Sequence, residues 1–240
     1  MRFFLLAAAL AFAPLAQAQT TITTPPVAAP APPPTAAHLA AARDAANVFL
    51  VESGAMQFAF DQSIALLAPR WRSQITASAM YQTLTPAHQQ AVVNFLNSDV
   101  ARLFTEESQA SVPAMLDFAA TRLAGILSEQ DLRDIATFYR QPPAKAQYLY
   151  GVQLGVYQAA GQTPPPPPQD TAEAEALLTA FNQTPAGQAF VAHSTDVGTI
   201  LQQAMQNSIN VQRLRQRVSA GLCAAAGDQC PPEWRAGQSQ

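Results

Sequence analysis

The sequence predicts an all-helical protein, arranged as an antiparallel helical bundle or as a short array of helical pairs. Between residues 36 and 226, apolar residues recur every three or four positions and almost never alternate. Glycine is scarce, at 10 residues, and most of the 20 prolines lie in two short stretches rather than in turns between strands. Charged residues form only 12% of the chain, whereas alanine, the strongest helix former, is abundant.

The first 18 residues have the pattern of a secretory signal peptide. Arg2 precedes an apolar run, Phe3 to Leu15, that is too short to span a bilayer, and Ala16-Gln17-Ala18 places small residues at the cleavage positions. No cysteine follows this site, so a lipid anchor there is not expected. We expect a mature chain that begins at Gln19 and is periplasmic or secreted.

Two proline-rich stretches organise the rest of the chain. Residues 19–35 combine Pro, Thr and Ala without apolar periodicity, which indicates an extended spacer. Residues 163–169 contain the run Pro164–Pro168, which would span about 15 Å as polyproline II. This run is either a crossover within one helical domain, residues 36–226, or a boundary between two lobes. Residues 227–240 are expected to form a C-terminal tail.

The first helices are expected at residues 36–54 and from residue 56 onward, separated by Gly54. Pro69 should stop the second helix or begin another one. Apolar residues form one stripe along this second helix: Met56, Phe60, Ile64 and Leu67. Phe58 lies off the stripe, so Met56, Phe58 and Phe60 are a candidate face for an apolar ligand or a partner. Ordinary core packing is the alternative that we favour.

Hydroxyl residues mark the starts of later helices. Thr85 stands before Pro86, and Ser128 opens the sequence Ser-Glu-Gln-Asp, which is similar to a capping box. The helix after Ser128 should bury one face, made of Leu132, Ile135, Phe138 and Tyr139.

A weak internal repeat places Phe95, Phe138 and Phe181 at intervals of 43 residues. An aliphatic residue precedes each phenylalanine by three positions and a hydroxyl residue precedes it by ten: Val92, Ile135 and Leu178, and Thr85, Ser128 and Thr171. Each unit would be a capped helix that ends on an aromatic residue, a proline-marked corner and a second helix that packs back. Chance is the rival explanation, because the chain contains 12 phenylalanines.

The segment from Leu127 to Ala146 resembles the core of a family of exported bacterial helical proteins, the domain-of-unknown-function family 2059. The resemblance rests on a capped acidic helix that ends in Phe138-Tyr139 and on a corner that contains Pro142. The family pattern at such a corner is Ser/Thr-Pro-x-Gly, from which Gln141 and Ala144 depart.

A second corner, after Phe181, contains the full pattern as Thr184-Pro185-Ala186-Gly187. Here Thr184 should cap the next helix, Pro185 should begin it, and Gly187 should allow a close approach of the neighbouring helix. The resemblance covers about residues 84–205. It implies an all-helical exported domain and brings no activity and no catalytic residues, and we interpret the corners as architecture rather than as a binding site.

No residue cluster in the sequence indicates catalysis, a metal or a cofactor. The three histidines stand far apart without further ligands at metal-binding spacing, and no nucleophile elbow or phosphate-binding loop is present. Glu106-Glu107 are expected in the first turn of a helix, and Arg213, Arg215 and Arg217 on a solvated helix face. The net charge of −3 gives no indication of nucleic-acid binding.

The two cysteines, Cys223 and Cys230, predict a disulfide, because an exporting cell places such a pair in an oxidising compartment. Gly227 between them should end a helix and let the chain reverse. Six intervening residues do not make the Cys-x-x-Cys motif of redox enzymes, so we expect a structural link.

Two classes of function are compatible with the sequence. The first is a non-catalytic interaction or adaptor protein of the cell envelope, without a membrane-spanning segment after signal cleavage. The second is a carrier for an apolar ligand such as a lipid or fatty chain, for which Met56, Phe58 and Phe60 would line the site.

Overall fold

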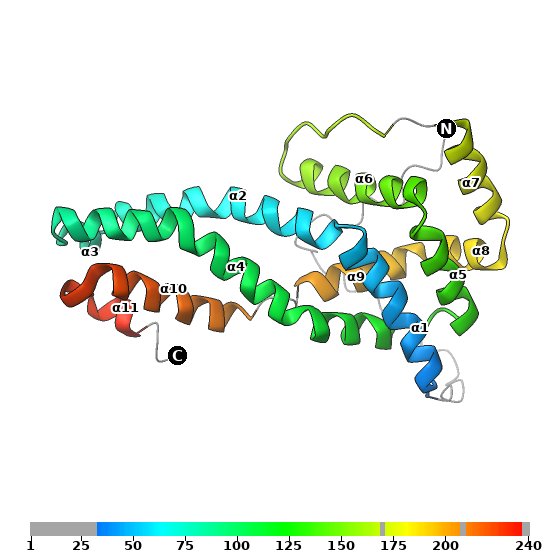
Figure 1. The fold of residues 1–240 in the computed structure, drawn as a ribbon, viewed down its shortest axis with the longest axis horizontal. Coiled ribbons are helices and arrows are strands. Elements are labelled where there is room, and N and C mark those ends of the chain that lie inside the picture. The colour runs from blue at the N-terminus through cyan, green and yellow to red at the C-terminus, as the bar shows by residue number, and fades with distance from the viewer. Residues whose placement is uncertain (1–32, 169–170, 207–209, 237–240) are drawn as a thin grey trace, which may run out of the picture. The chain divides into compact units, whose positions relative to one another are not determined.

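The computed structural model describes residues 33–168, 171–206 and 210–236, and the regular elements within these ranges are all helices (Figure 1). The predicted all-helical class is therefore confirmed. The expected signal peptide and nearly all of the expected spacer lie outside the described residues.

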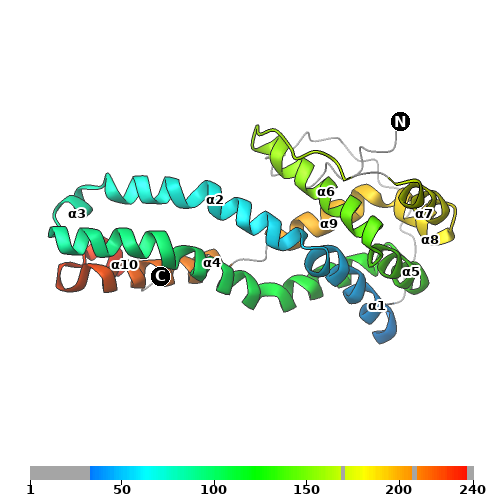
Figure 2. The ribbon, with the colours of Figure 1, turned by 45° about the horizontal axis from the view of Figure 1, so that its top comes forward.

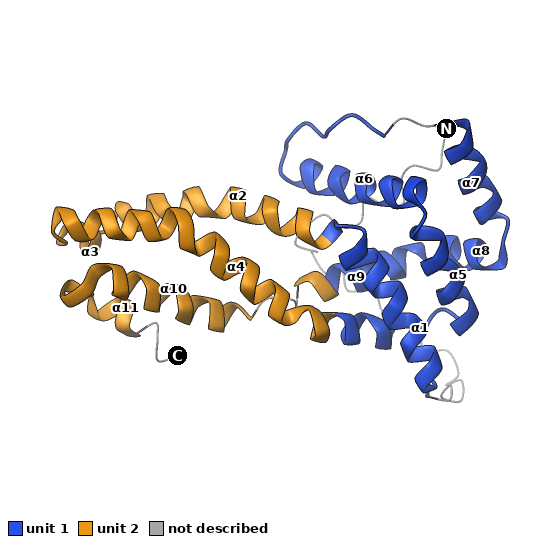
Figure 3. Cartoon of the chain, in the orientation of Figure 1, with its two compact units in different colours: residues 1–55, 116–203 blue, residues 56–115, 204–240 orange. Residues whose placement is uncertain are grey.

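The chain forms two compact units, and each is built from two separate stretches of sequence (Figure 3). Unit 1 combines the N-terminal part up to Ala55 with Leu116–Gln203, and unit 2 combines Met56–Met115 with the part from Ala204 onward. Residues 163–168, the described part of the proline-rich crossover, lie inside unit 1. The run therefore does not separate the units, and the single helical domain expected over residues 36–226 is divided elsewhere.

Unit 1 is organised around a short helix, α5, that packs against α1, a π-helix η2, α6 and α8. Ser128 caps α5 through a hydrogen bond from the Asp131 N–H (3.1 Å), as the sequence predicts. The helices of this unit are α1 (Ala36–Asn47), η2 (Val48–Glu52), the end of α4 (Pro86–Leu123), α5 (Glu129–Tyr139), α6 (Pro142–Ala159), α7 (Ala172–Asn182), α8 (Pro185–Ala192) and most of α9 (Ser194–Gln206).

Unit 2 contains α2 and α10 alongside the first part of α4, as Figures 1 and 2 both show. Its further elements, α3, η3 and α11, are short. The elements of this unit have the following bounds: α2 (Ala55–Thr76), α3 (Ala79–Gln82), α10 (Val211–Ala226), η3 (Gly227–Gln229) and α11 (Pro232–Ala236). The hydrophobic core of unit 2 consists of Leu84, Val92, Leu96, Val100, Leu222, Ala226, Cys230 and Trp234. The expected tail after residue 226 is thus partly helical, and Cys230 and Trp234 belong to the core.

Two prolines lie within helices rather than at their ends. The prediction that Pro69 stops a helix or begins another is wrong, because α2 continues to Thr76, and α4 likewise continues past Pro113. Both prolines are exposed. A proline removes one helical hydrogen bond, and on the solvent side water can satisfy the carbonyl that loses its partner.

Candidate functional site

An aromatic cluster lies inside unit 1, where η2, α5, α6 and α8 meet. Phe49 of η2 is buried, and its ring centroid lies 4.9 Å from that of Tyr139 on α5 and 5.0 Å from that of Tyr148 on α6. Phe190 of α8 stacks on Phe49 with centroids 5.8 Å apart and planes 15° apart. Each such ring contact contributes about 0.5–1.5 kcal/mol to stability beyond the burial of apolar area. Because the rings come from four different elements, these contacts hold the four elements together.

Phe49 belongs to a π-helix, Val48–Glu52, in which backbone hydrogen bonds join residues five positions apart rather than four. The wider turn changes the helix face on which the following side chains lie. The Ser53 hydroxyl donates to the Phe49 carbonyl oxygen (2.5 Å) and accepts from the Ala55 N–H (3.0 Å). Gly54, with a φ of 81°, ends the segment. The sequence predicts one continuous helix here, and apolar spacing alone gives no signal for the π-helix.

Two phenols are enclosed by this cluster. The Tyr148 hydroxyl is buried and has no hydrogen-bond partner among the described residues. Burial raises the pKa of Tyr139 and of Tyr148 above the ordinary value of 10.0. Burial of a hydroxyl without a hydrogen-bond partner reduces the stability of a fold by about 1–3 kcal/mol. A bound molecule that accepted a hydrogen bond from Tyr148 would remove this cost.

Arg140, directly after α5, forms the charged edge of unit 1. Its guanidinium donates to both carboxylate oxygens of Asp44 (2.5 and 3.0 Å) and of Glu52 (2.9 and 3.0 Å). The hydrogen bond from Arg140 is the main reason that the pKa of Glu52 is lowered. Because the three side chains are 37% to 47% exposed, these ion pairs orient α1, η2 and α5 more than they stabilise them.

The two predicted corners lie in unit 1, and their phenylalanines meet. Phe138 and Phe181 are both buried, and their rings stack with centroids 3.8 Å apart and planes 4° apart. Tyr139 also contacts Phe181, at 6.2 Å between centroids. The expected burial of Phe138 and Phe181 is therefore confirmed, and the contact that buries them joins the two corners to each other.

The second corner has the local structure that its sequence predicts. Thr184 caps α8 through a hydrogen bond from the Gly187 N–H (3.0 Å), and Pro185 is the first helical residue. A β-carbon on Gly187 would lie 2.0 Å from the Phe181 carbonyl oxygen, so only glycine fits this close approach. At the first corner Pro142 begins α6, but Gln141 makes no capping hydrogen bond.

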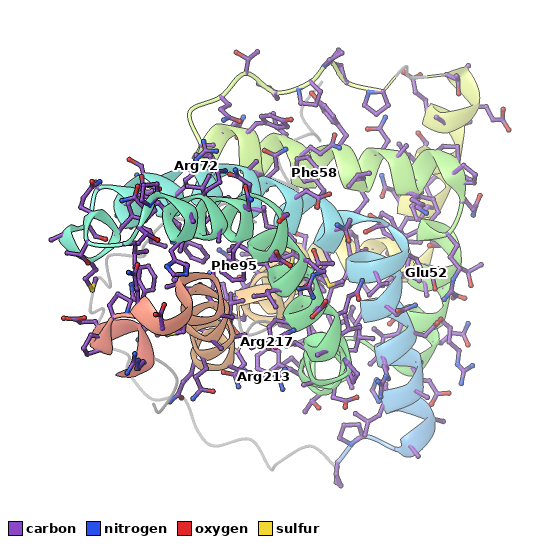
Figure 4. All side chains as sticks on the ribbon, turned by 60° about the vertical axis from the view of Figure 1, so that its left-hand side comes forward. Glu52, Phe58, Arg72, Phe95, Arg213 and Arg217 are labelled. Atoms are coloured by element: carbon purple, nitrogen blue, oxygen red, sulfur yellow. A yellow bond between two sulfur atoms is a disulfide. The ribbon has the colours of Figure 1, made fainter. Side chains whose placement is uncertain are left out.

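The first member of the expected repeat does not form a corner. Phe95 lies within α4, which continues to Leu123, and Asp99 stands where the other two members have proline. Its half-buried ring lies over Gly221 of α10, where an added β-carbon would come within 2.1 Å of it. Figure 4 labels this ring.

The candidate apolar face Met56, Phe58 and Phe60 is largely core. Met56 and Phe60 are buried in unit 2, and the Phe60 ring meets Phe104 of α4 edge-on at 5.9 Å. Phe58 is half-buried. Packing therefore accounts for two of the three residues.

Further along α2 an apolar surface remains incompletely covered. No residue from 61 to 76 is buried, although the stripe continues past Leu67 through Trp71 to Ile75. Ile64, Leu67 and Trp71 are half-buried, and Leu66 at the edge of the stripe is 51% exposed. We call Ile64, Leu66, Leu67 and Trp71 the α2 apolar face. The sequence predicts this stripe only as far as Leu67, because Pro69 is expected there to end the helix or begin another, whereas α2 continues to Thr76.

An ionic cluster that the sequence did not predict joins α4 to α10 in unit 2. Glu107 is only 3% exposed, and it accepts hydrogen bonds from Arg213 Nε (2.6 Å) and Arg217 (3.1 Å). Arg217 also pairs with Glu106, which accepts a second hydrogen bond from Arg102 (2.6 Å). Figure 4 shows Arg213 and Arg217 near each other on α10.

Two sequence interpretations are therefore wrong. Glu106-Glu107 lie in the middle of α4 rather than in a first turn, because the helix begins at Pro86. Arg213 and Arg217 are one helical turn apart and pair with the same carboxylate, so the solvated face expected for them is wrong, whereas Arg215 is exposed as expected. A separation of more than 100 residues between the partners hides this pairing from local patterns.

The predicted disulfide between Cys223 and Cys230 is present. It connects the last turns of α10 to the segment before α11, and Gly227, with a φ of 57°, allows the reversal between them. The Gln229 side chain accepts hydrogen bonds from the Thr85 N–H (2.9 Å) and from His88 Nδ1 (3.0 Å), which holds this segment on the start of α4.

Within residues 33–168, 171–206 and 210–236, no three His, Cys, Asp or Glu side chains are placed to hold a metal ion together. In the same ranges, no helix has the length and apolar character needed to cross a membrane.

Comparison of the chain with protein-family models, with curated proteins and with solved structures gives no match.

Proposed function

We propose that the chain is an exported, non-catalytic helical protein of the bacterial cell envelope that acts by binding a partner protein. The observation on which this depends is the α2 apolar face. Ile64, Leu67 and Trp71 on this face are half-buried, with Trp71 packed against the hydrophobic core of unit 2, and Leu66 beside them is 51% exposed, so part of this apolar face remains accessible. Contiguous apolar surface of this kind is typical of an interaction site, whereas a single exposed leucine is not.

Export is the second part of the proposal. It is supported by the signal-peptide pattern of residues 1–18 and by the disulfide, which is characteristic of oxidising compartments. Intact-mass analysis of protein from its own host should show a chain that begins at Gln19 outside the cytoplasm. A cytoplasmic pool that retains Met1 would contradict it.

Membership of the domain-of-unknown-function family 2059 is also proposed rather than shown. It is supported by the corner sequences, and the corner at Thr184-Pro185-Ala186-Gly187 has a capped helix start and a position, Gly187, at which only glycine fits.

Site-specific photocross-linking in the host tests the α2 apolar face. A photoreactive amino acid at Leu66 should give one dominant adduct of higher mass, because this side chain would lie in the interface. The same group at Gln90, an exposed polar position on α4 of the same unit, is the matched control. No adduct at Leu66, or the same adduct from Gln90, would reject the assignment.

A carrier for an apolar ligand such as a lipid or fatty chain is the second candidate, because the Tyr148 hydroxyl, inside an aromatic cluster, has no hydrogen-bond partner in the part of the chain that the structure describes. A bound molecule with a carbonyl or ester oxygen would accept its hydrogen bond. Native mass spectrometry of protein from its own host should then show a lipid-sized addition, and a bare protein mass would exclude the carrier.

A further inference from the structure

The connection between α6 and α7 contains five consecutive prolines, Pro164–Pro168, within unit 1. Gly161, with a φ of 65°, turns the chain away from α6, and Thr171 caps α7 by accepting a hydrogen bond from the Ala174 N–H (3.1 Å). The run is therefore held at both ends by helices of the same unit. In Figure 1 the connection forms an arch beside α6.

Local chemistry defines the conformation of this run. Each proline ring fixes φ near −65°, and each residue before a proline is directed toward extended ψ values. Residues 164–168 therefore favour polyproline II, with about 3 Å per residue and three residues per turn. The five prolines have no N–H groups, so the run has only carbonyl oxygens with which to form backbone hydrogen bonds.

The exposure pattern leaves one side of the run accessible. Pro164, Pro165 and Pro168 are half-buried, and of these Pro165 and Pro168 lie three positions apart, on one ridge of a polyproline II helix. Pro166 and Pro167 are exposed. The run is thus partly covered at both of its ends and presents the two neighbouring proline rings in its middle to solvent.

A role as a rigid spacer between α6 and α7 does not explain the proline run. α6 and α7 contact each other directly, so no rigid segment is needed to hold them apart. A connection with glycine or serine would also close the loop, whereas five prolines fix a conformation in advance.

We propose that Pro164–Pro168 is a docking strand for a partner domain whose groove is lined by aromatic side chains. Such grooves insert proline rings between aromatic rings and donate hydrogen bonds to the intervening carbonyl oxygens. Binding is favourable because the strand is already ordered and loses little conformational entropy. The inference rests on the proposed interaction function and names the class of partner.

The test is a calorimetric titration of the mature chain with a purified SH3 or WW domain that binds oligoproline peptides. The double variant Pro166→Ala/Pro167→Ala should bind about 10-fold more weakly or not at all. The matched control is Pro33→Ala/Pro34→Ala, a change of two adjacent prolines in the spacer, which should leave the affinity unchanged. Far-ultraviolet circular dichroism should show the same helix content in all three proteins.

Two outcomes would overturn the proposal. One is an intact chain that does not bind at concentrations at which a free peptide of residues 162–168 does, which would mean that the run is occluded. The other is an equal loss of affinity from the spacer variant. Neither outcome affects cross-linking from Leu66, so failure of the docking strand and failure of the proposed function can be told apart.

Discussion

The stacked rings of Phe138 and Phe181 should be a principal source of stability in unit 1. They come from α5 and α7, they are 4% and 8% exposed, and their planes are nearly parallel at a centroid distance of 3.8 Å. Truncation of a buried phenylalanine to alanine costs about 3–5 kcal/mol, from lost burial and from the cavity that remains. A domain with a total stability of about 5–15 kcal/mol would lose a large part of it.

The two substitutions should not be additive. Each one removes the same ring contact, which contributes about 0.5–1.5 kcal/mol beyond area burial. The double variant Phe138→Ala/Phe181→Ala should therefore be less destabilised than the sum of the single variants, by about that amount. Thr179→Ala, at an exposed position of α7, is the control and should change the free energy of unfolding by less than about 0.5 kcal/mol.

Urea denaturation followed by circular dichroism provides the free energy of unfolding for each variant. If Phe138→Ala and Phe181→Ala shift it no more than Thr179→Ala, the rings are not core, and the two corners do not meet as described. Exact additivity with large single effects would instead show that the rings are buried separately. Tyr139→Ala should also be severe, since its ring contacts Phe49, Tyr148 and Phe190.

Three further predictions concern polar groups and the disulfide. Tyr148→Phe should raise the free energy of unfolding of ligand-free protein by about 1–3 kcal/mol in urea titrations, and no increase would mean that the hydroxyl has a partner. Because the pKa of Glu52 is lowered, its ion pair with Arg140 stabilises the fold at pH values above 4.5, and this stabilisation is lost as the pH falls through the lowered pKa. Arg140→Gln should reduce the dependence of the free energy of unfolding on pH between about pH 7 and 3, and an unchanged dependence would contradict the ion pair. Cys223→Ser/Cys230→Ser should lower stability by about 2 kcal/mol in thermal unfolding, and wild-type protein in reductant should match it.

Local patterns in the sequence predicted those parts of the fold that depend on neighbouring residues. The caps at Ser128, Thr171 and Thr184 require only a hydroxyl three positions before an N–H, and all three are present. The disulfide and the buried face of α5 are similarly local. These features depend on periodicity and short-range hydrogen bonds, which one sequence is enough to reveal.

Features that depend on distant partners were missed. Glu107 and Arg213 are 106 positions apart, and nothing near either residue indicates that the other will cover it. The unpartnered Tyr148 hydroxyl and the π-helix at Val48–Glu52 likewise depend on how several helices meet. Pro69 misled the prediction because a proline on an exposed helix face is tolerated when the opposite face packs.

The interleaving of the two units along the chain has a consequence for how the protein can be divided. Unit 1 is interrupted by residues 56–115, and unit 2 needs the segment from residue 204 onward to complete its core. No single cut therefore releases either unit as an uninterrupted polypeptide. A stop codon before Leu222 would remove the four core residues that pack with Val92, Leu96 and Val100 from the C-terminal side: Leu222, Ala226, Cys230 and Trp234. On the ribosome, unit 2 cannot finish folding until Trp234, which lies far along the chain from its core partners Val92 and Leu96, has emerged.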